Sequence, residues 1–145
     1  MLKCDPVMEE LNNLQAKLIS VRETDFSMFP ELLDRDNKTV EYNINFQILP
    51  KVDENIAAVS FRVVMCQGAT NLLSISVEYT FRVNGLSVFV KDGGKSIAGT
   101  LSSELVSVAI GTTRGMLIVK TSGTSLSQFI LPVVNIRVKG VTEHQ

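Results

Sequence analysis

Few residues of this sequence could carry out catalysis or hold a metal ion. The only histidine, His144, lies in the last positions of the sequence, and the two cysteines, Cys4 and Cys66, are far apart in it. No GxxxxGK[ST], GxGxxG, HExxH or CxxC run occurs. The densest polar cluster, Asp34–Asp36, falls in a turn-like segment with no nucleophile or base beside it. The sequence therefore predicts a protein that is not an enzyme and needs neither a cofactor nor a metal.

A cluster of apolar residues offers binding chemistry instead. Phe26, Met28 and Phe29 stand close together just before Pro30, in a stretch without regular periodicity. Methionine in particular adapts its shape to varied apolar partners. We interpret the three side chains as part of a groove for apolar segments of other chains, or as a hydrophobic staple of the fold itself.

Composition and charge narrow the class of protein further. The 145 residues carry 14 Lys and Arg against 15 Asp and Glu, and 45% of them are hydrophobic. A net charge of −1 argues against a protein whose main task is to neutralise nucleic-acid phosphate. A chain of this length can bury a core without disulfide bonds. Residues 1–10 lack the apolar core of an export signal, so we expect a cytoplasmic protein with free thiols.

The elements that must position these residues begin with strands. Apolar and polar residues alternate most strictly from Val40 to Ile48, and less strictly in three other segments. Such alternation is typical of strands with one buried face, and short turns between them favour an antiparallel meander. We expect an N-terminal arm or short helix over residues 1–13 and a four-stranded sheet over residues 14–83. The predicted strands are Leu14–Asp25, Val40–Ile48, Ile56–Gln67 and Leu72–Val83.

A crossover segment, a long helix and a C-terminal segment follow the sheet. The dipeptide Asn84-Gly85 is typical of a hairpin turn, so Leu86–Val90 is a candidate short strand within the crossover, residues 84–98. The periodicity predicts a helix over residues 99–122, which Gly123 would end. Residues 123–145 form the remaining segment. The sequence thus predicts a single α+β domain in which a four-stranded antiparallel sheet is followed by a long helix.

The predicted helix carries two apolar stripes. One stripe runs through Leu101 and Leu105 at spacings of three and four, and the other contains Val106, Ile110 and Leu117. One stripe can cover the sheet, so the other needs a second partner. We therefore expect the protein to be oligomeric, with Val106, Ile110 and Leu117 at the interface between copies. The alternative is a helix buried between the sheet and the C-terminal segment.

The order of elements and one stretch of sequence resemble a known family. In the stretch TTRGMLIVKTSGTSLSQFILPVVNI, residues 112–136, an arginine is followed by a glycine and then by a Leu-Pro-x-x-Asn-apolar close. The residues in question are Arg114, Gly123, Leu131, Pro132, Asn135 and Ile136. The pattern is similar to the end of the long helix, and the loop after it, in SecB-type protein-export chaperones. Gly111 stands where that family usually has a proline.

The resemblance implies an ATP-independent molecular chaperone, a holdase. Such a protein is a homotetramer, a dimer of dimers, that keeps unfolded preproteins competent for export and hands them to the translocation motor SecA. Glu23 would be a contact for the translocase, although Ser27 and Ser74 stand where the family has acidic residues. A dedicated client such as an antitoxin is therefore an alternative partner. The candidate groove residues are Phe26, Met28, Phe29, Leu73, Ile75, Leu101 and Leu105.

Two other functions stay open at this point. The chain could be an oligomeric assembly or interaction protein whose apolar surfaces are consumed by self-association. It could also bind a small apolar ligand in a cavity between sheet and helix, without chaperone activity. Leu73, Ile75, Leu101 and Leu105 would then serve only the core.

Overall fold

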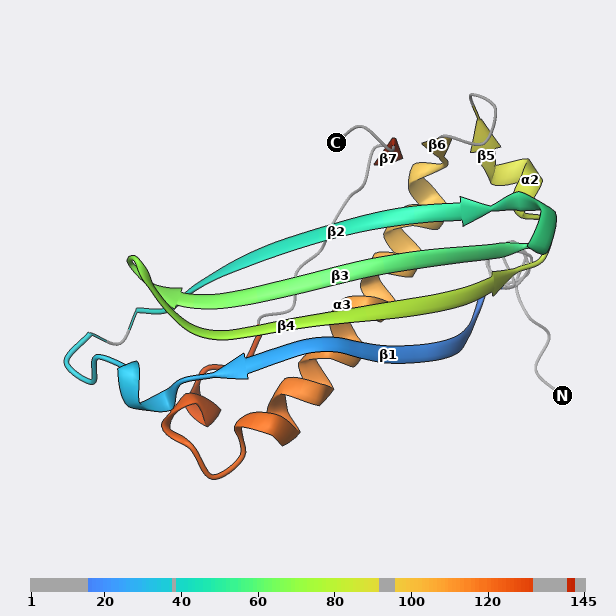
Figure 1. The fold of residues 1–145 in the computed structure, drawn as a ribbon. Helices are drawn as coiled ribbons and strands as arrows, with labels where there is room; N and C mark the ends of the chain where they lie inside the picture. Colours follow the sequence, from blue (N-terminus) through green and yellow to red (C-terminus); the bar gives the residue numbers. More distant parts are fainter. Residues whose placement is uncertain (1–15, 38, 92–95, 132–140, 143–145) are drawn as a thin grey trace, which may run out of the picture.

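The chain forms one large sheet, a long helix across one face of it, and a small sheet of short strands (Figure 1). The computed structural model describes residues 16–37, 39–91, 96–131 and 141–142, so the predicted arm over residues 1–13 lies outside it. The predicted α+β fold, with a four-stranded antiparallel sheet and a long helix, is confirmed. The elements are β1 (Ala16–Met28), η1 (Pro30–Leu32), β2 (Glu41–Lys51), η2 (Val52–Glu54), β3 (Ile56–Gln67), β4 (Thr70–Val83), α2 (Leu86–Phe89), β5 (Val90–Lys91), β6 (Ser96–Ile97), α3 (Gly99–Thr121), η4 (Ser125–Gln128) and β7 (Val141–Thr142).

The large sheet has the strand order β1-β4-β3-β2, with every neighbouring pair antiparallel. Its register places the alternating apolar residues of adjacent strands opposite one another, as in the row Ile44, Val63, Ile75 and Phe26. Because successive side chains point to opposite faces of a strand, the sheet has an apolar inner face and a polar outer face. The small sheet has the order β5-β6-β7.

Helix α3 lies obliquely across the inner face of the large sheet (Figure 1). Many of its buried side chains form one row at a spacing of four residues, namely Leu101, Leu105, Ala109, Thr113, Leu117 and Thr121. Such a row is a ridge that packs into the grooves of a neighbouring surface. The helix and the sheet therefore share a single hydrophobic core.

The predicted role of Val106, Ile110 and Leu117 as an interface between copies is contradicted by this packing. Their exposed fractions are 0%, 2% and 5%, and all three belong to the core beneath the sheet. Both stripes of α3 are apolar in sequence, but the geometry of the crossing turns this one inward. The far end of the other stripe, at Gly115 and Val119, turns outward instead.

Strand β1 is longer than the sequence predicted. It runs to Met28, three residues beyond the expected end at Asp25, so Phe26 and Met28 belong to the strand and do not follow it. Its pairing with β4 shifts register between Leu18 and Ser20 and again between Glu23 and Asp25. Each shift adds a residue to one strand and interrupts the alternation of apolar and polar residues. For this reason the alternation predicted an earlier end of the strand.

The predicted strand after Asn84-Gly85 is a turn of helix over most of its length. Leu86–Phe89 form α2, and only Val90 enters a strand, β5. Gly85 has a φ of 70°, in the left-handed region that glycine tolerates, and it starts the helical turn. Leu86 is fully buried and attaches this turn to the core.

Helix α3 ends one residue before the predicted end. Ser122 is the C-cap and Gly123, with a φ of 81°, turns the chain toward η4. The Arg114 Nε donates to the Leu131 carbonyl oxygen at 2.9 Å, so Arg114 ties the segment after η4 to the helix. The motif residues Pro132, Asn135 and Ile136 lie outside the described residues. Among the helices that the structure describes, none is long and apolar enough to cross a membrane.

Candidate functional site

The polar groups singled out from the sequence serve the fold. The backbone amide of Asp36 donates to Asp34 Oδ1 at 3.0 Å, so Asp34–Asp36 is a turn closed by its own side chain. Gln67 holds this loop, because its amide nitrogen donates to the carbonyl oxygen of Asn37 at 2.7 Å. Cys66 is buried. Over the described residues, no three His, Cys, Asp or Glu side chains gather as metal ligands, and His144 and Cys4 lie outside those residues.

One buried polar pair lies inside the core. The hydroxyl groups of Tyr79 and Thr113 share a hydrogen bond that connects β4 to α3. Burial raises the pKa of Tyr79, and the hydrogen bond to Thr113 opposes this effect. Burial likewise raises the pKa of Tyr42 on β2. Both phenols thus stay protonated at neutral pH, and their arrangement is structural.

Four of the predicted groove residues belong to the core. The exposed fractions of Leu73 and Ile75 on β4 are 1% and 0%, and Leu101 and Leu105 on α3 are fully buried. The structure contradicts their assignment to a groove, because they pack between sheet and helix and no other chain can reach them. Their strict alternation and helical spacing are what place them there.

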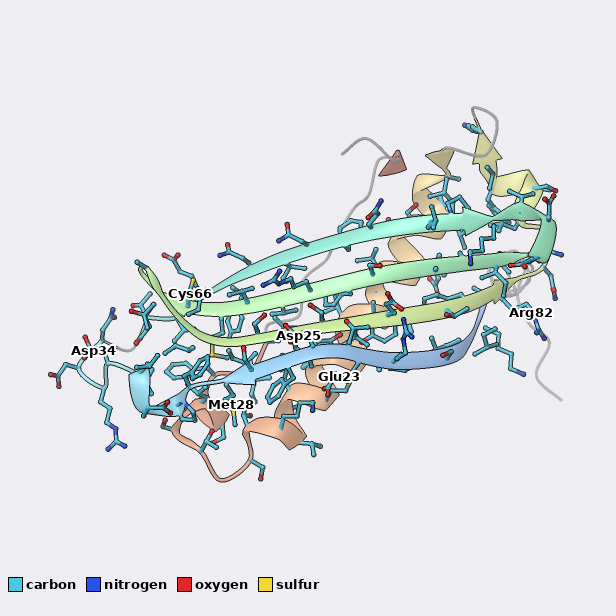
Figure 2. The ribbon with its side chains drawn as sticks, viewed as in Figure 1. Glu23, Asp25, Met28, Asp34, Cys66 and Arg82 are labelled. Carbon is cyan, nitrogen blue, oxygen red and sulfur yellow. The ribbon has the colours of Figure 1, made fainter. Side chains whose placement is uncertain are left out.

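Phe26 and Glu23 are engaged by one lysine at the end of α3. Lys120 Nζ lies 2.6 Å from Glu23 Oε1 and 4.4 Å from the centre of the Phe26 ring. The lysine therefore joins α3 to β1 through an ion pair and a cation–π contact. Figure 2 shows Glu23 on β1 above the helix. The predicted translocase contact at Glu23 thus sits on a carboxylate that is already paired within the chain.

Exposed apolar side chains gather where η1 and η4 meet. Phe29, Leu32 and Ile130 have exposed fractions of 43%, 50% and 57%, and Met28 and Phe129 lie half-buried beside them in sequence. The two short helices are adjacent, because Ser125 Oγ donates to the Pro30 carbonyl oxygen at 3.3 Å. Figure 1 shows them side by side at the end of β1. We call Met28, Phe29, Leu32, Phe129 and Ile130 the η1–η4 patch.

A hollow of about 440 Å³ lies next to the η1–η4 patch. Leu33 and Phe129 give it apolar walls, and Asp34, Asn37 and Gln128 give it polar ones. The backbone of Phe29 is fixed here, since its amide donates to the Leu72 carbonyl oxygen at 2.8 Å. The site thus combines a fixed backbone with apolar side chains that water can reach.

Of the predicted groove residues, the η1–η4 patch contains Met28 and Phe29. Leu32, Phe129 and Ile130 were not predicted from the sequence. Leu32 lies in a charged, turn-like segment of the sequence, and Ile130 lies in a long apolar segment, so neither stands out from its neighbours by periodicity. An apolar residue within a polar turn was the available clue to Leu32.

Two further surfaces are open to another chain. On the outward face of α3, Ser107, Gly111 and Gly115 repeat at a spacing of four and are exposed, with Ile118 and Val119 beyond them at 49% and 75%. The outer edge of β1 is the second surface. Within the described residues this strand pairs only with β4, and its Ile19 and Val21 are 41% and 44% exposed.

Comparisons of the sequence with protein-family models and with curated proteins gave no match. The fold and the surfaces described above are therefore the basis for assigning a function.

Proposed function

We propose that this protein is an ATP-independent chaperone, a holdase that binds unfolded chains and needs no catalytic group. The observation that carries this proposal is the η1–η4 patch, where Phe29, Leu32 and Ile130 stay exposed although the core nearby is well packed. Exposed apolar patches on soluble proteins commonly mark interaction sites. The SecB-like order of strands and helix is consistent with the same activity.

The chemistry of an unfolded client fits this end of the molecule. An unfolded chain exposes apolar side chains and unpaired backbone groups. The η1–η4 patch can bind the former, and the free edge of β1, which leads into the patch, can pair with the latter by strand addition. Many weak contacts of this kind along one client add up to useful affinity without sequence specificity.

We propose that the working form is a homotetramer built as a dimer of dimers. The outward face of α3 supports this assembly, because Ser107, Gly111 and Gly115 let a second helix approach closely while Val119 supplies apolar area. An interface on the outward face of α3 would replace the one predicted at Val106, Ile110 and Leu117, and it would leave the edge of β1 to the client.

In this proposal the clients are preproteins awaiting export from the cytoplasm, or one dedicated client such as an antitoxin. Delivery to SecA is the less supported branch. Glu23 is already paired with Lys120, and Ser27 and Ser74 provide no carboxylate on β1 and β4. A dedicated client therefore fits the surface better than a general export route.

The test is binding to a permanently unfolded polypeptide, followed by size-exclusion light scattering. Replacing Phe29 and Leu32 together with serine should weaken binding about tenfold, since two apolar anchors are lost. Phe26 and Met28 are left unchanged because both pack against the core. Val88→Ser is the matched control, because Val88 is 79% exposed on α2, at the opposite end of the sheet (Figure 1).

The same binding experiment distinguishes the holdase from the second candidate function, that of an oligomeric assembly protein. The outward face of α3 favours assembly by itself, because a copy of the chain could use it without any client. An oligomer that gains mass with the unfolded polypeptide, but not with its folded form, supports the holdase. A stable oligomer that ignores the unfolded polypeptide would instead assign the assembly function.

A further inference from the structure

The outer face of the large sheet is polar, open and hollowed. A hollow of about 530 Å³ lies over its centre, between side chains from all four strands. A second hollow of about 260 Å³ shares Gln47, Ser60 and Glu78 with the first and extends to Lys51. Together they form one groove along the sheet, which we call the outer groove. In Figure 2 this face is turned toward the viewer, and α3 lies behind the sheet.

The strand register arranges the side chains of the outer groove in cross-strand rows. Asn45, Arg62, Ser76 and Asp25 form one row, and Gln47, Ser60, Glu78 and Arg22 form the next. Amide, hydroxyl and guanidinium groups, which can donate hydrogen bonds, thus line the groove together with the carboxylate of Glu78.

The charges of this face are mostly positive, although the whole chain has a net charge of −1. By the register, its cations are Lys17, Arg22, Lys51, Arg62 and Arg82, and its acids are Asp25, Glu41 and Glu78. Arg22 and Glu78 neutralise each other in an ion pair. Four cations then face two acids, so the outer face is complementary to an acidic partner.

Arg62 is the cation best placed to anchor such a partner. It is exposed at the wall of the larger hollow, and its cross-strand neighbours, Asn45 and Ser76, carry no charge. Among the described residues no carboxylate pairs with it. A free guanidinium can hold a carboxylate through two parallel hydrogen bonds.

A second cationic position lies further along the groove. Lys51, Arg82 and Lys17 form one cross-strand row with Ile56. Ile56 is six residues from Arg62 on β3, a separation of roughly 20 Å along an extended strand. An extended segment of about six residues spans the same distance.

We propose that the outer groove binds an extended acidic segment of a partner protein, with one carboxylate on Arg62 and another at the Lys17, Lys51 and Arg82 row. Within the described strands no aromatic side chain lies on this face, so it lacks the stacking platforms that single-stranded nucleic acid uses. This binding site lies opposite the core face and adds to the proposed function without depending on it.

The probe is a fluorescein-labelled heptapeptide with a glutamate at each end, six residues apart, and glycine and serine between them. Its binding is measured by fluorescence anisotropy. A peptide with glutamine at both ends should bind about tenfold more weakly, because each charge-assisted hydrogen bond is lost. Arg62→Gln should weaken binding of the acidic peptide by about threefold, because only one of the two contacts is lost. Lys91→Gln, an exposed cation on β5 outside this face, should leave binding unchanged.

Two results would overturn the proposal. One is equal affinity of the acidic peptide for the parent chain and Arg62→Gln, with Arg62→Gln/Arg82→Gln also unchanged. The other is tighter binding of an oligothymidylate of the same length, which would assign the groove to nucleic acid. Because Arg62 is exposed, thermal unfolding should confirm that the variants fold. Binding of unfolded polypeptide by Arg62→Gln is measured in parallel, so that a failure here is distinguishable from a failure of the holdase proposal.

Discussion

The two faces of the large sheet come from the same strands and have opposite roles. On β3, Phe61 is 2% exposed beneath the sheet, whereas Ser60 and Arg62 on either side of it are exposed above. On β4, Val77 and Tyr79 are buried while Glu78 between them pairs with Arg22 on the outer face. The inner face supports the fold, and the outer face is available for recognition.

The two faces therefore differ in how well the fold tolerates substitutions. The inner face is shared with α3, so each side chain there fits several neighbours at once. The outer face has no layer above it among the described residues, so its side chains contact mainly solvent and can contact a partner. On one strand, substitutions of inward residues should therefore change stability, and substitutions of the outward residues between them should change binding.

The largest expected effect comes from breaking the inner face. Phe61→Ala should lower the free energy of unfolding by about 3–5 kcal/mol, because it opens a cavity in a well-packed core. Ser60→Ala, its neighbour on the outer face, should change it by less than about 0.5 kcal/mol. Denaturant unfolding of both variants measures the contrast. Similar losses in the two variants would mean that the outer face is also covered.

The contrast between faces was predictable for β2, β3 and β4 and less so for β1. Alternation of apolar and polar residues, strictest on β2, indicated β2, β3 and β4 and their buried sides, whereas the register shifts in β1 broke the pattern. The orientation of α3 was not predictable, because both of its stripes are apolar and the crossing geometry decides which part of each is buried.

The candidate site was predictable only in part for a related reason. Phe29 stood out as an apolar residue outside regular periodicity, but Leu73 and Leu101 obey the periodicity of their elements and are simply core. Ile130 becomes part of the η1–η4 patch only because the chain folds η4 against η1, which is a long-range contact. Local patterns in a sequence do not report contacts of that kind.

A smaller effect should appear at the hydrogen bond between Tyr79 and Thr113 inside the core. Burial raises the pKa of Tyr79 above its ordinary value of 10.0, so in the folded chain this phenol keeps its proton at a pH where the unfolded chain loses it. The protonated phenol of Tyr79 therefore contributes its full share to the free energy of unfolding below about pH 10. As the pH rises further, this contribution falls by at most about 1.4 kcal/mol per pH unit.

Tyr79→Phe sharpens that test. At neutral pH it should cost about 1 kcal/mol, because the hydrogen bond with Thr113 is lost. Above pH 10 its stability should fall less steeply with pH than that of the parent chain. Denaturant midpoints between pH 8 and pH 11, a range of about three pH units, give both slopes. Identical slopes would show that Tyr79 ionises as readily in the folded chain as in the unfolded one.

The smallest effect concerns α3, which repeats the contrast between faces. Its inward row is large and buried, whereas Gly111 and Gly115 are exposed on its outward face, and a Cβ added at either would meet no atom within 4 Å. Gly115→Ala should therefore stabilise the fold by about 0.5–1 kcal/mol, because alanine favours the helix more than glycine does.

If a second copy packs closely against this face of α3, the methyl group of Gly115→Ala should also weaken the oligomer. The stability of the fold and the strength of assembly would then change in opposite directions. Denaturant unfolding and light-scattering mass separate the two, with Ser107→Ala as a control on the same face. A loss of stability in Gly115→Ala together with unchanged mass would contradict both the open face of α3 and its role in assembly.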